Sequence, residues 1–184
     1  LEPYYAKWEL TAGISGEPDP LGDHRSIDYP NPPMLASPAI KLFKESAKNI
    51  GLNPYQMASG NMSQTYTNPD GETLNQCMFC AFCTMYGCDF SSKSDPLATV
   101  LPTAQKTGNC EIRTDSLVRR VLHENGKATG VMYTDTRTGQ EFIQPADVVV
   151  LAAFTFSNNR LLMLSNIGEI YNPETRKGTI GRNF

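Results

Sequence analysis

Four of the five cysteines stand close together, and their spacing is the feature of this sequence with the clearest chemical meaning. Cys77, Cys80, Cys83 and Cys88 follow the pattern C-x2-C-x2-C-x4-C. Thiolates at these gaps can converge on one point, which a metal ion or an iron–sulfur cluster requires and a set of disulfides does not. The bacterial ferredoxin run is C-x2-C-x2-C-x3-C, so only the last gap differs. We predict that these four cysteines are the ligands of a metal or cluster.

Two other readings of the four cysteines stay open. Four thiolates also make a closed structural zinc site, although zinc sites usually use two well-separated C-x2-C pairs, and a compact run favours iron and sulfide. The cysteines can also be paired or free thiols in an apolar loop that contains Met78, Phe79, Phe82 and Tyr86. The fifth, Cys110, is expected to be a buried structural thiol, because free cysteine packs as a small hydrophobic residue.

Length, charge and hydropathy restrict the class of protein. The chain has 184 residues, about one domain by length, and a net charge of −3, so it has no basic field that would attract nucleic acid. No apolar run approaches the roughly 20 residues of a membrane-spanning helix. The chain begins at Leu1 with no signal-peptide pattern. We expect it to be the middle part of a longer protein.

The first half of the sequence is predicted to be poor in regular structure. Residues 1–35 are rich in proline and glycine, which predicts an extended arm without a long helix that needs a partner surface. A helix is expected from Ser37, its cap, to Gly51. Residues 52–76 read as loop, and a further helix is expected over 95–108, although Pro102 can break it. The residues expected on the core-facing side of the first helix are Ile40, Leu42, Phe43 and Ala47.

The second half is predicted to be a run of strands, so the fold class is α+β. Strands are expected over 110–114, 117–122, 128–135, 141–144 and 147–153, followed by a helix over 158–165. Asn125-Gly126 predicts a tight hairpin turn. The apolar run over 148–154 predicts that the last strand is buried.

Several stretches resemble the glucose–methanol–choline (GMC) flavoenzymes. In the second half these are residues 111–121, 127–133, 146–153 and 160–168, which are similar to the meander, flavin-domain strand and Ser-Gly-Ile-Gly signature of that family. Residues 25–33, 61–69, 77–88 and 181–184 resemble one branch, the flavoprotein subunits of gluconate 2-dehydrogenases. The chain departs from the family signature in two places. Phe154, Asn158 and Asn159 replace Gly and Ser/Pro, and Ser165-Asn166 replaces Ser-Gly.

The resemblance implies a fragment of a two-domain FAD-binding fold. Residues 1–109 would be a loop-rich substrate or cap region that carries the cysteines, and residues 110–184 a β-meander and part of the FAD-binding domain. The main chain of Val118 would run beside the adenine of FAD, although Val118 can equally be an ordinary strand residue. The sequence contains no G-x-G-x-x-G, and its histidines, His24 and His123, read as solvated loop residues, so no catalytic residue is assigned.

The implied activity is that of an FAD-dependent oxidoreductase acting on a CH–OH group of a sugar acid or polyol such as gluconate. The cysteines would pass electrons from flavin to a cytochrome subunit, in a complex that includes a small subunit and is periplasmic and membrane-associated by resemblance. The isolated chain is expected to be inactive and to hold FAD weakly. The alternative from a different class is a small structural zinc or iron module without catalysis.

Overall fold

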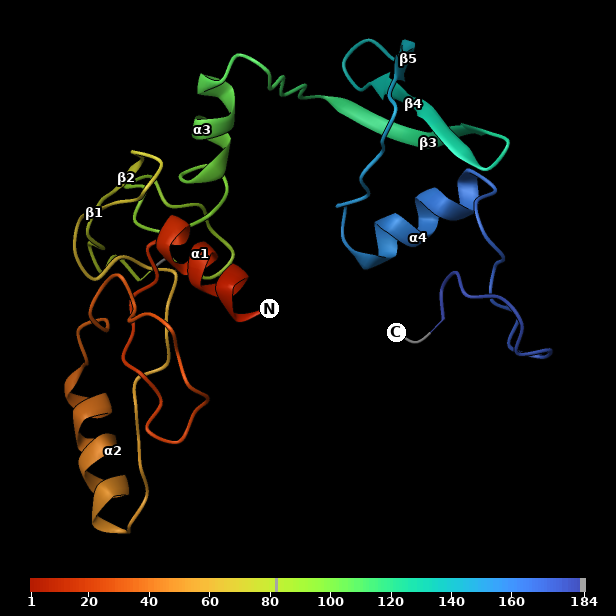
Figure 1. The fold of residues 1–184 in the computed structure, drawn as a ribbon. Coiled ribbons are helices and arrows are strands. Elements are labelled where there is room, and N and C mark those ends of the chain that lie inside the picture. The colour runs from red at the N-terminus through yellow and green to blue at the C-terminus, as the bar shows by residue number, and fades with distance from the viewer. Residues whose placement is uncertain (82, 183–184) are drawn as a thin grey trace. The chain divides into compact units, whose positions relative to one another are not determined.

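The computed structural model describes residues 1–81 and 83–182, which divide into two compact units. Unit 1 begins at Leu1 and ends at Glu111, and unit 2 begins at Ile112. The structure is a mixture of helix and sheet. Figure 1 colours the chain from red in unit 1 to blue in unit 2. Phe82 and the last two residues of the 181–184 motif, which entered the sequence analysis, lie outside the described residues.

Helix α1 (Glu2–Ala12) occupies part of the segment that was expected to hold no long helix. Pro3 falls in the first turn, where backbone N–H groups make no hydrogen bond within the helix, so a proline is tolerated there. Gly13 ends the helix in the left-handed conformation, at φ 65°. The prediction of a helix-free arm was therefore wrong, because the dense run of helix-breaking residues begins only at Gly13.

The segment after α1 forms much of the core of unit 1. Ser15 pairs with both Asn31 and Ser59 through isolated β-bridges, and the Ser15 and Asn31 side chains are buried. The Asn31 side-chain amide donates to the Gly13 carbonyl at 2.8 Å. Polar side chains can be buried here because they are hydrogen-bonded: the Ser15 hydroxyl accepts the Ser63 N–H at 3.0 Å, and the Asn31 side-chain oxygen accepts the Gln64 amide at 3.1 Å. An arm that requires a separate partner surface was therefore the wrong expectation for this part of the chain.

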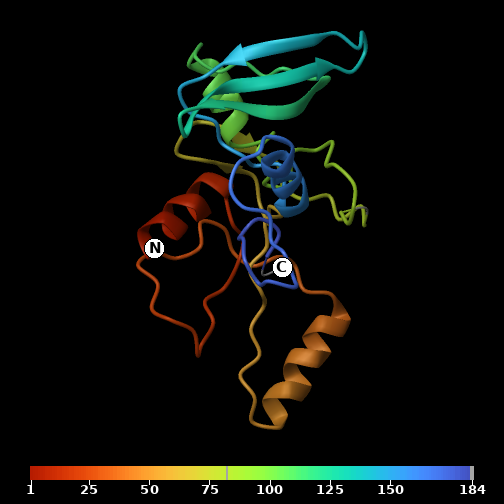
Figure 2. The same ribbon diagram turned by 90° about the vertical axis from the view of Figure 1, so that its right-hand side faces the viewer.

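Helix α2 (Pro38–Asn49) begins as predicted, but it does not bury its apolar side. The Ser37 hydroxyl accepts the N–H of Ile40 at 3.3 Å, which caps the first turn. Of the four residues expected to face a core, Ala47 is buried, whereas Ile40, Leu42 and Phe43 are exposed. Figures 1 and 2 show the reason: the helix stands apart from the other helices of unit 1.

The remaining elements of unit 1 are short. Strands β1 (Tyr66–Thr67) and β2 (Thr73–Leu74) form a two-stranded antiparallel sheet. Helix α3 (Val100–Lys106) begins later than the predicted position 95. Pro102 then lies in its first turn and does not break it midway, because the residues before Val100 form turns instead.

Unit 2 contains a three-stranded antiparallel sheet in the order β3 (Ser116–Glu124), β4 (Lys127–Asp135), β5 (Glu141–Pro145). The predicted turn joins β3 and β4: Asn125 and Gly126 have φ of 50° and 78°, the positive values that a type I′ hairpin needs. The strand expected over 110–114 is not formed. Asp115, at φ 54°, interrupts the extended backbone just before β3 begins.

Helix α4 (Thr155–Leu164) packs against β3, and its C-terminal cap, Ser165, ties the two together. The N–H of Val121 donates to the Ser165 hydroxyl at 2.8 Å, and this hydroxyl donates to the Leu161 carbonyl at 2.5 Å. The His123 ring nitrogen Nε2 lies 2.8 Å from the Ser165 carbonyl oxygen. His123 is therefore a strand residue with a structural contact and not a loop residue.

The predicted buried strand over 147–153 is absent. This segment has no strand assignment, and the exposed fractions of Val148 and Val150 are 76% and 80%. An apolar run of this kind becomes a buried strand when neighbouring strands pair with it on both sides. Among the described residues, the sheet of unit 2 ends at β5 and supplies no such neighbours.

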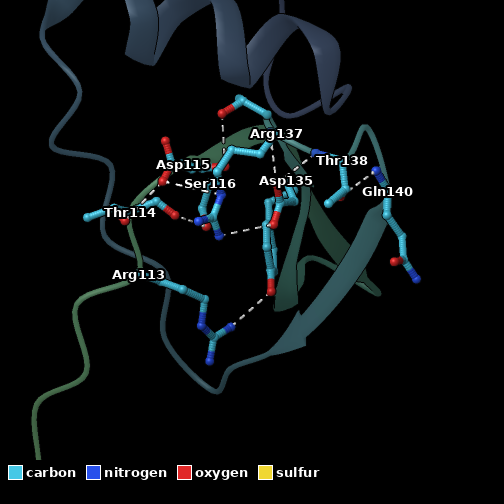
Figure 3. Close-up of polar contacts among 10 residues, drawn as sticks. Arg113, Thr114, Asp115, Ser116, Asp135, Arg137, Thr138 and Gln140 are labelled. Carbon is cyan, nitrogen blue, oxygen red and sulfur yellow. Dashed lines mark hydrogen bonds and ion pairs between the residues drawn. The ribbon is translucent and has the colours of Figure 1, made fainter.

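A group of polar side chains fixes the start of β3 (Figure 3). The Arg137 guanidinium lies 3.6 Å from a carboxylate oxygen of Asp115 and 3.7 Å from one of Asp135. Arg113, just before the strand, donates to the Tyr133 hydroxyl at 3.2 Å. These exposed contacts are individually weak. Together they join the start of β3 to the end of β4 and its following turn.

Candidate functional site

The four clustered cysteines lie in a loop whose two ends meet at one buried residue. We call residues 77–91 the cysteine loop. The Cys77 N–H donates to the Met62 carbonyl at 2.9 Å, and the Met62 N–H donates to the Ser92 carbonyl at 2.9 Å. The Ser92 hydroxyl donates to the Gln76 carbonyl at 3.0 Å, which joins the two ends directly. Met62 is fully buried, so the base of the cysteine loop is anchored in the core of unit 1.

The thiols of this loop share one cavity. Cys77, Cys80, Cys83 and Cys88 all line a cavity of about 430 Å³, together with apolar side chains that include Met78 and Phe90. All four are free thiols; Cys77 and Cys88 are half-buried, and Cys80 and Cys83 are exposed. Cys110 is also free and half-buried, and it is not among the residues of this cavity wall.

The thiols line this cavity without gathering tightly. Among residues 1–81 and 83–182, no group of three or more His, Cys, Asp or Glu side chains is arranged so that it could hold a metal ion. The convergence on one point that the spacing permits is therefore not present in this conformation. Metal or cluster ligation by the four cysteines stays a prediction.

Hydrogen-bond donors face several of the sulfurs. The N–H of Phe79 donates to Cys77 Sγ and that of Ser92 to Cys88 Sγ, each at 3.4 Å. The side-chain amide of Asn61 lies 3.9 Å from Cys83 Sγ. Such donors stabilise a thiolate more than a neutral thiol, and the thiolate is the form that binds metals.

The pKa of the Cys88 thiol reflects both burial and these hydrogen bonds. Burial is the largest single influence and raises the pKa of its thiol. The backbone N–H groups of Ser92, Phe90 and Lys93, with the Ser92 side chain, outweigh burial and hold the pKa below the ordinary 9.0. Cys88 is therefore easier to deprotonate than an isolated cysteine.

The backbone of the cysteine loop is strained. Phe79, Ala81 and Met85 have φ of 54°, 64° and 66°, values that non-glycine residues rarely adopt. Each such residue costs on the order of 1–2 kcal/mol. Strain of this kind concentrates at functional sites.

Two residues outside the loop hold it from one side, and the sequence analysis missed both. Asn61 and Lys93 pair through an antiparallel bridge beside the base of the loop. The Lys93 ammonium donates to the carbonyls of Cys83 at 2.7 Å and Tyr86 at 3.2 Å. The sequence carries no local signal for this arrangement, because Asn61 lies far from the cysteines along the chain and Lys93 resembles any surface lysine.

Val118, the predicted flavin contact, lies in unit 2 on an edge strand. It is half-buried and pairs with Tyr133 of β4, and the register shifts between Val118 and Arg120. Among the strands of the described residues, β3 pairs with β4 on one side and with none on the other, so its second edge carries backbone groups that none of these strands uses. Bulges of this kind are common beside ligand sites. This geometry suits a main-chain contact to adenine, which stays a prediction.

Comparison with known proteins identifies the family. A family model described as GMC oxidoreductase matches residues 34–184. The chain belongs to the GMC oxidoreductase family. The resemblance described from the sequence is thus confirmed, and this family binds FAD.

Three relatives of this GMC chain are named as dehydrogenases. It is 37% identical to the gluconate 2-dehydrogenase flavoprotein of Pantoea cypripedii over all of this chain and 32% of the relative. It is 29% identical to the 2-methyl-1,2-propanediol dehydrogenase of Mycolicibacterium austroafricanum, over 90% of this chain and 29% of the relative. It is 25% identical to the oxygen-dependent choline dehydrogenase of Staphylococcus xylosus, over 91% of this chain and 27% of the relative.

The chain spans about a third of the length of these curated relatives. None of the described helices is both long and apolar enough to cross a membrane. His24 is exposed, and His123 contacts Ser165, so neither histidine is placed in a catalytic role here.

Proposed function

We propose that the protein to which this chain belongs is an FAD-dependent dehydrogenase that oxidises a CH–OH group of a sugar acid or polyol and passes the electrons to a cytochrome. The 37% identity with the gluconate 2-dehydrogenase flavoprotein, over the whole chain, supports a gluconate-like substrate. The observation that carries the electron-transfer part is the cysteine loop. All four clustered cysteines are free thiols that line one cavity, and thiolates are the ligands that hold iron–sulfur clusters.

The donor set of the cysteine loop fits an iron–sulfur cluster. Its ligands would be Cys77, Cys80, Cys83 and Cys88, and three of them suffice for a three-iron cluster. The N–H groups aimed at Cys77 and Cys88 would stabilise the bound thiolates. When bound, such a cluster carries single electrons between a two-electron flavin and a one-electron haem. The role of the chain would be to supply the four thiolates from one loop whose ends are tied to the core of unit 1.

For FAD, unit 2 offers one contact surface. The edge of β3 at Val118 would lie along the adenine, held in place by the β3–β4 hairpin and by α4. When bound, FAD accepts hydride from the alcohol carbon. The glycine-rich turn that would cradle the pyrophosphate does not occur in these 184 residues, so we expect the isolated chain to be inactive and to bind FAD weakly.

The proposed assembly follows the gluconate 2-dehydrogenase resemblance. We assign the full protein a cytochrome subunit and a small subunit as partners, in a periplasmic complex associated with the membrane. The net charge of −3 gives no support for a nucleic-acid partner.

The test separates flavin reduction from acceptor reduction in the full-length protein. Cys80→Ser and Cys83→Ser should slow delivery of electrons to the acceptor at least tenfold while flavin bleaching by substrate stays near the wild-type rate, because hydride transfer takes place at the flavin. Stopped-flow spectroscopy follows both steps. Cys110→Ser, which removes a thiol outside the cavity wall, is the matched control.

Two outcomes would contradict the relay. Acceptor reduction at the wild-type rate in both variants would mean that the cysteines do not carry electrons. Equal loss of both half-reactions would instead indicate a structural zinc site, since removing a zinc ligand unfolds its region. Iron and acid-labile sulfide analysis of the wild-type protein, with an electron paramagnetic resonance spectrum, separates the two metals directly.

A further inference from the structure

We propose that Asn61 and Lys93 are positioning residues for the cysteine loop, and that together they raise the reduction potential of the group that its thiolates bind. The inference rests on the proposed electron-transfer function of that loop. It adds two residues, one from each segment beside the base of the loop, that hold Cys83 in place and act on the charge of the site.

Asn61 approaches Cys83 from a fixed backbone. Its own N–H donates to the Ser59 hydroxyl at 3.1 Å, and the next residue, Met62, is fully buried. The side-chain amide therefore extends from a rigid segment to Cys83 Sγ at 3.9 Å. An N–H group directed at a cysteine sulfur withdraws negative charge from it, which favours the reduced state of a cluster.

Lys93 fixes the backbone of the loop beside the same cysteine. Its ammonium donates to the carbonyls of Cys83 at 2.7 Å and Tyr86 at 3.2 Å, so one side chain joins two points of the loop. Lys93 also lines the cavity of the four thiols. Among the ion pairs of the described residues none involves Lys93, although the carboxylate of Asp89 lines the same cavity.

Both contacts act in the same direction. Each electron that reduces the site comes from the reduced flavin, which is oxidised, and then leaves to the acceptor; no bond to Asn61 or Lys93 forms or breaks. Added negative charge is stabilised by a sulfur-directed N–H and by a nearby ammonium. The pair therefore makes the site a better electron acceptor for the flavin and also keeps Cys83 at the cavity.

The experiment measures the midpoint potential of the full-length protein by redox titration monitored with electron paramagnetic resonance. Asn61→Leu and Lys93→Met should each lower the equilibrium constant for one-electron reduction about tenfold, a shift of about 59 mV to more negative potential. Lys93→Arg keeps the charge and should keep the wild-type potential. Lys106→Met is the matched control, because it removes the same charge from a lysine that pairs with Glu72 and is outside this cavity wall.

Iron and labile sulfide are measured on every variant. Wild-type potentials in both Asn61→Leu and Lys93→Met would overturn this inference and leave the electron relay intact. A shift in Lys106→Met as large as that in Lys93→Met would also overturn it. If Lys93→Met loses its iron, retention of iron in Lys93→Arg supports the positioning role, and loss in both variants with no shift in Asn61→Leu overturns it. Wild-type protein without iron and sulfide would refute the relay itself, before any variant is compared.

Discussion

Replacing Ser165 with alanine should loosen the contact between α4 and β3 more than any other single serine change in unit 2. The Ser165 hydroxyl accepts the N–H of Val121 at 2.8 Å and donates to the Leu161 carbonyl at 2.5 Å. Exposed fractions of 5% for Ser165 and 4% for Val121 show that water does not reach this contact easily. Alanine would leave the Val121 N–H buried without an acceptor.

The magnitude follows from the cost of an unsatisfied buried donor, about 1–3 kcal/mol. The Leu161 carbonyl keeps a second partner, the Ser165 N–H at 3.0 Å, so the loss falls mainly on Val121. If the opening free energy at Val121 drops by this amount, its amide should exchange with solvent roughly 5 to 150 times faster.

Amide hydrogen exchange read at Val121 is the measurement. Ser165→Thr keeps a hydroxyl at the site and should retain most of the protection. Ser116→Ala makes the same chemical change in β3, the strand that contains Val121. The Ser116 hydroxyl donates to the exposed Thr114 carbonyl, so its loss should change exchange at Val121 little. Equal effects of Ser165→Ala and Ser116→Ala would refute the reasoning.

Two further predictions concern strain and pH. Phe154 lies at φ 67° and ψ 157°, a region almost confined to glycine. Phe154→Gly should therefore raise the free energy of unfolding, measured by urea titration, by about 1 kcal/mol. Phe156→Gly, which places glycine inside α4, should lower it. The Lys44 ammonium, with the Gln56 N–H, holds the pKa of Glu17 below its ordinary 4.5. The stability from this contact is therefore complete above about pH 4.5 and is lost as pH falls through the folded-state pKa of Glu17. The chemical shift of the Gln56 amide should follow this protonation in the wild type and should not follow it in Glu17→Gln.

Local signals predicted the elements that depend on neighbouring residues. The cap at Ser37 and the turn at Asn125-Gly126 are set by a few adjacent residues, and both are formed. The strand predicted over 147–153 is not formed because the prediction assumed neighbouring strands on both sides. The apolar pattern of the segment does not show whether such partners are present. Helix α1 was missed because residues 1–35 were treated as one proline- and glycine-rich segment, whereas most of the prolines and glycines lie after the helix end at Gly13.

In the candidate site, too, local spacing predicted some residues, and contacts between distant segments place the others. The spacing of the cysteines predicted that the four thiols lie close together, and in the structure all four line one cavity, although their role as ligands stays a prediction. Asn61, Met62 and Lys93 could not be found from spacing, because hydrogen bonds between distant segments place them there. Phe154 and Asn166 show a third case: both are non-glycine residues at positive φ, which their residue types did not predict.

The closed base of the cysteine loop makes that segment a removable insert. Gln76 and Ser92 are joined across the base, and Met62 contacts both ends, so the chain enters and leaves at almost the same point. A short turn could replace residues 77–91 without moving the core of unit 1. A single insertion or deletion at this point could therefore add or remove all four clustered thiols at once while the rest of the fold of unit 1 is kept.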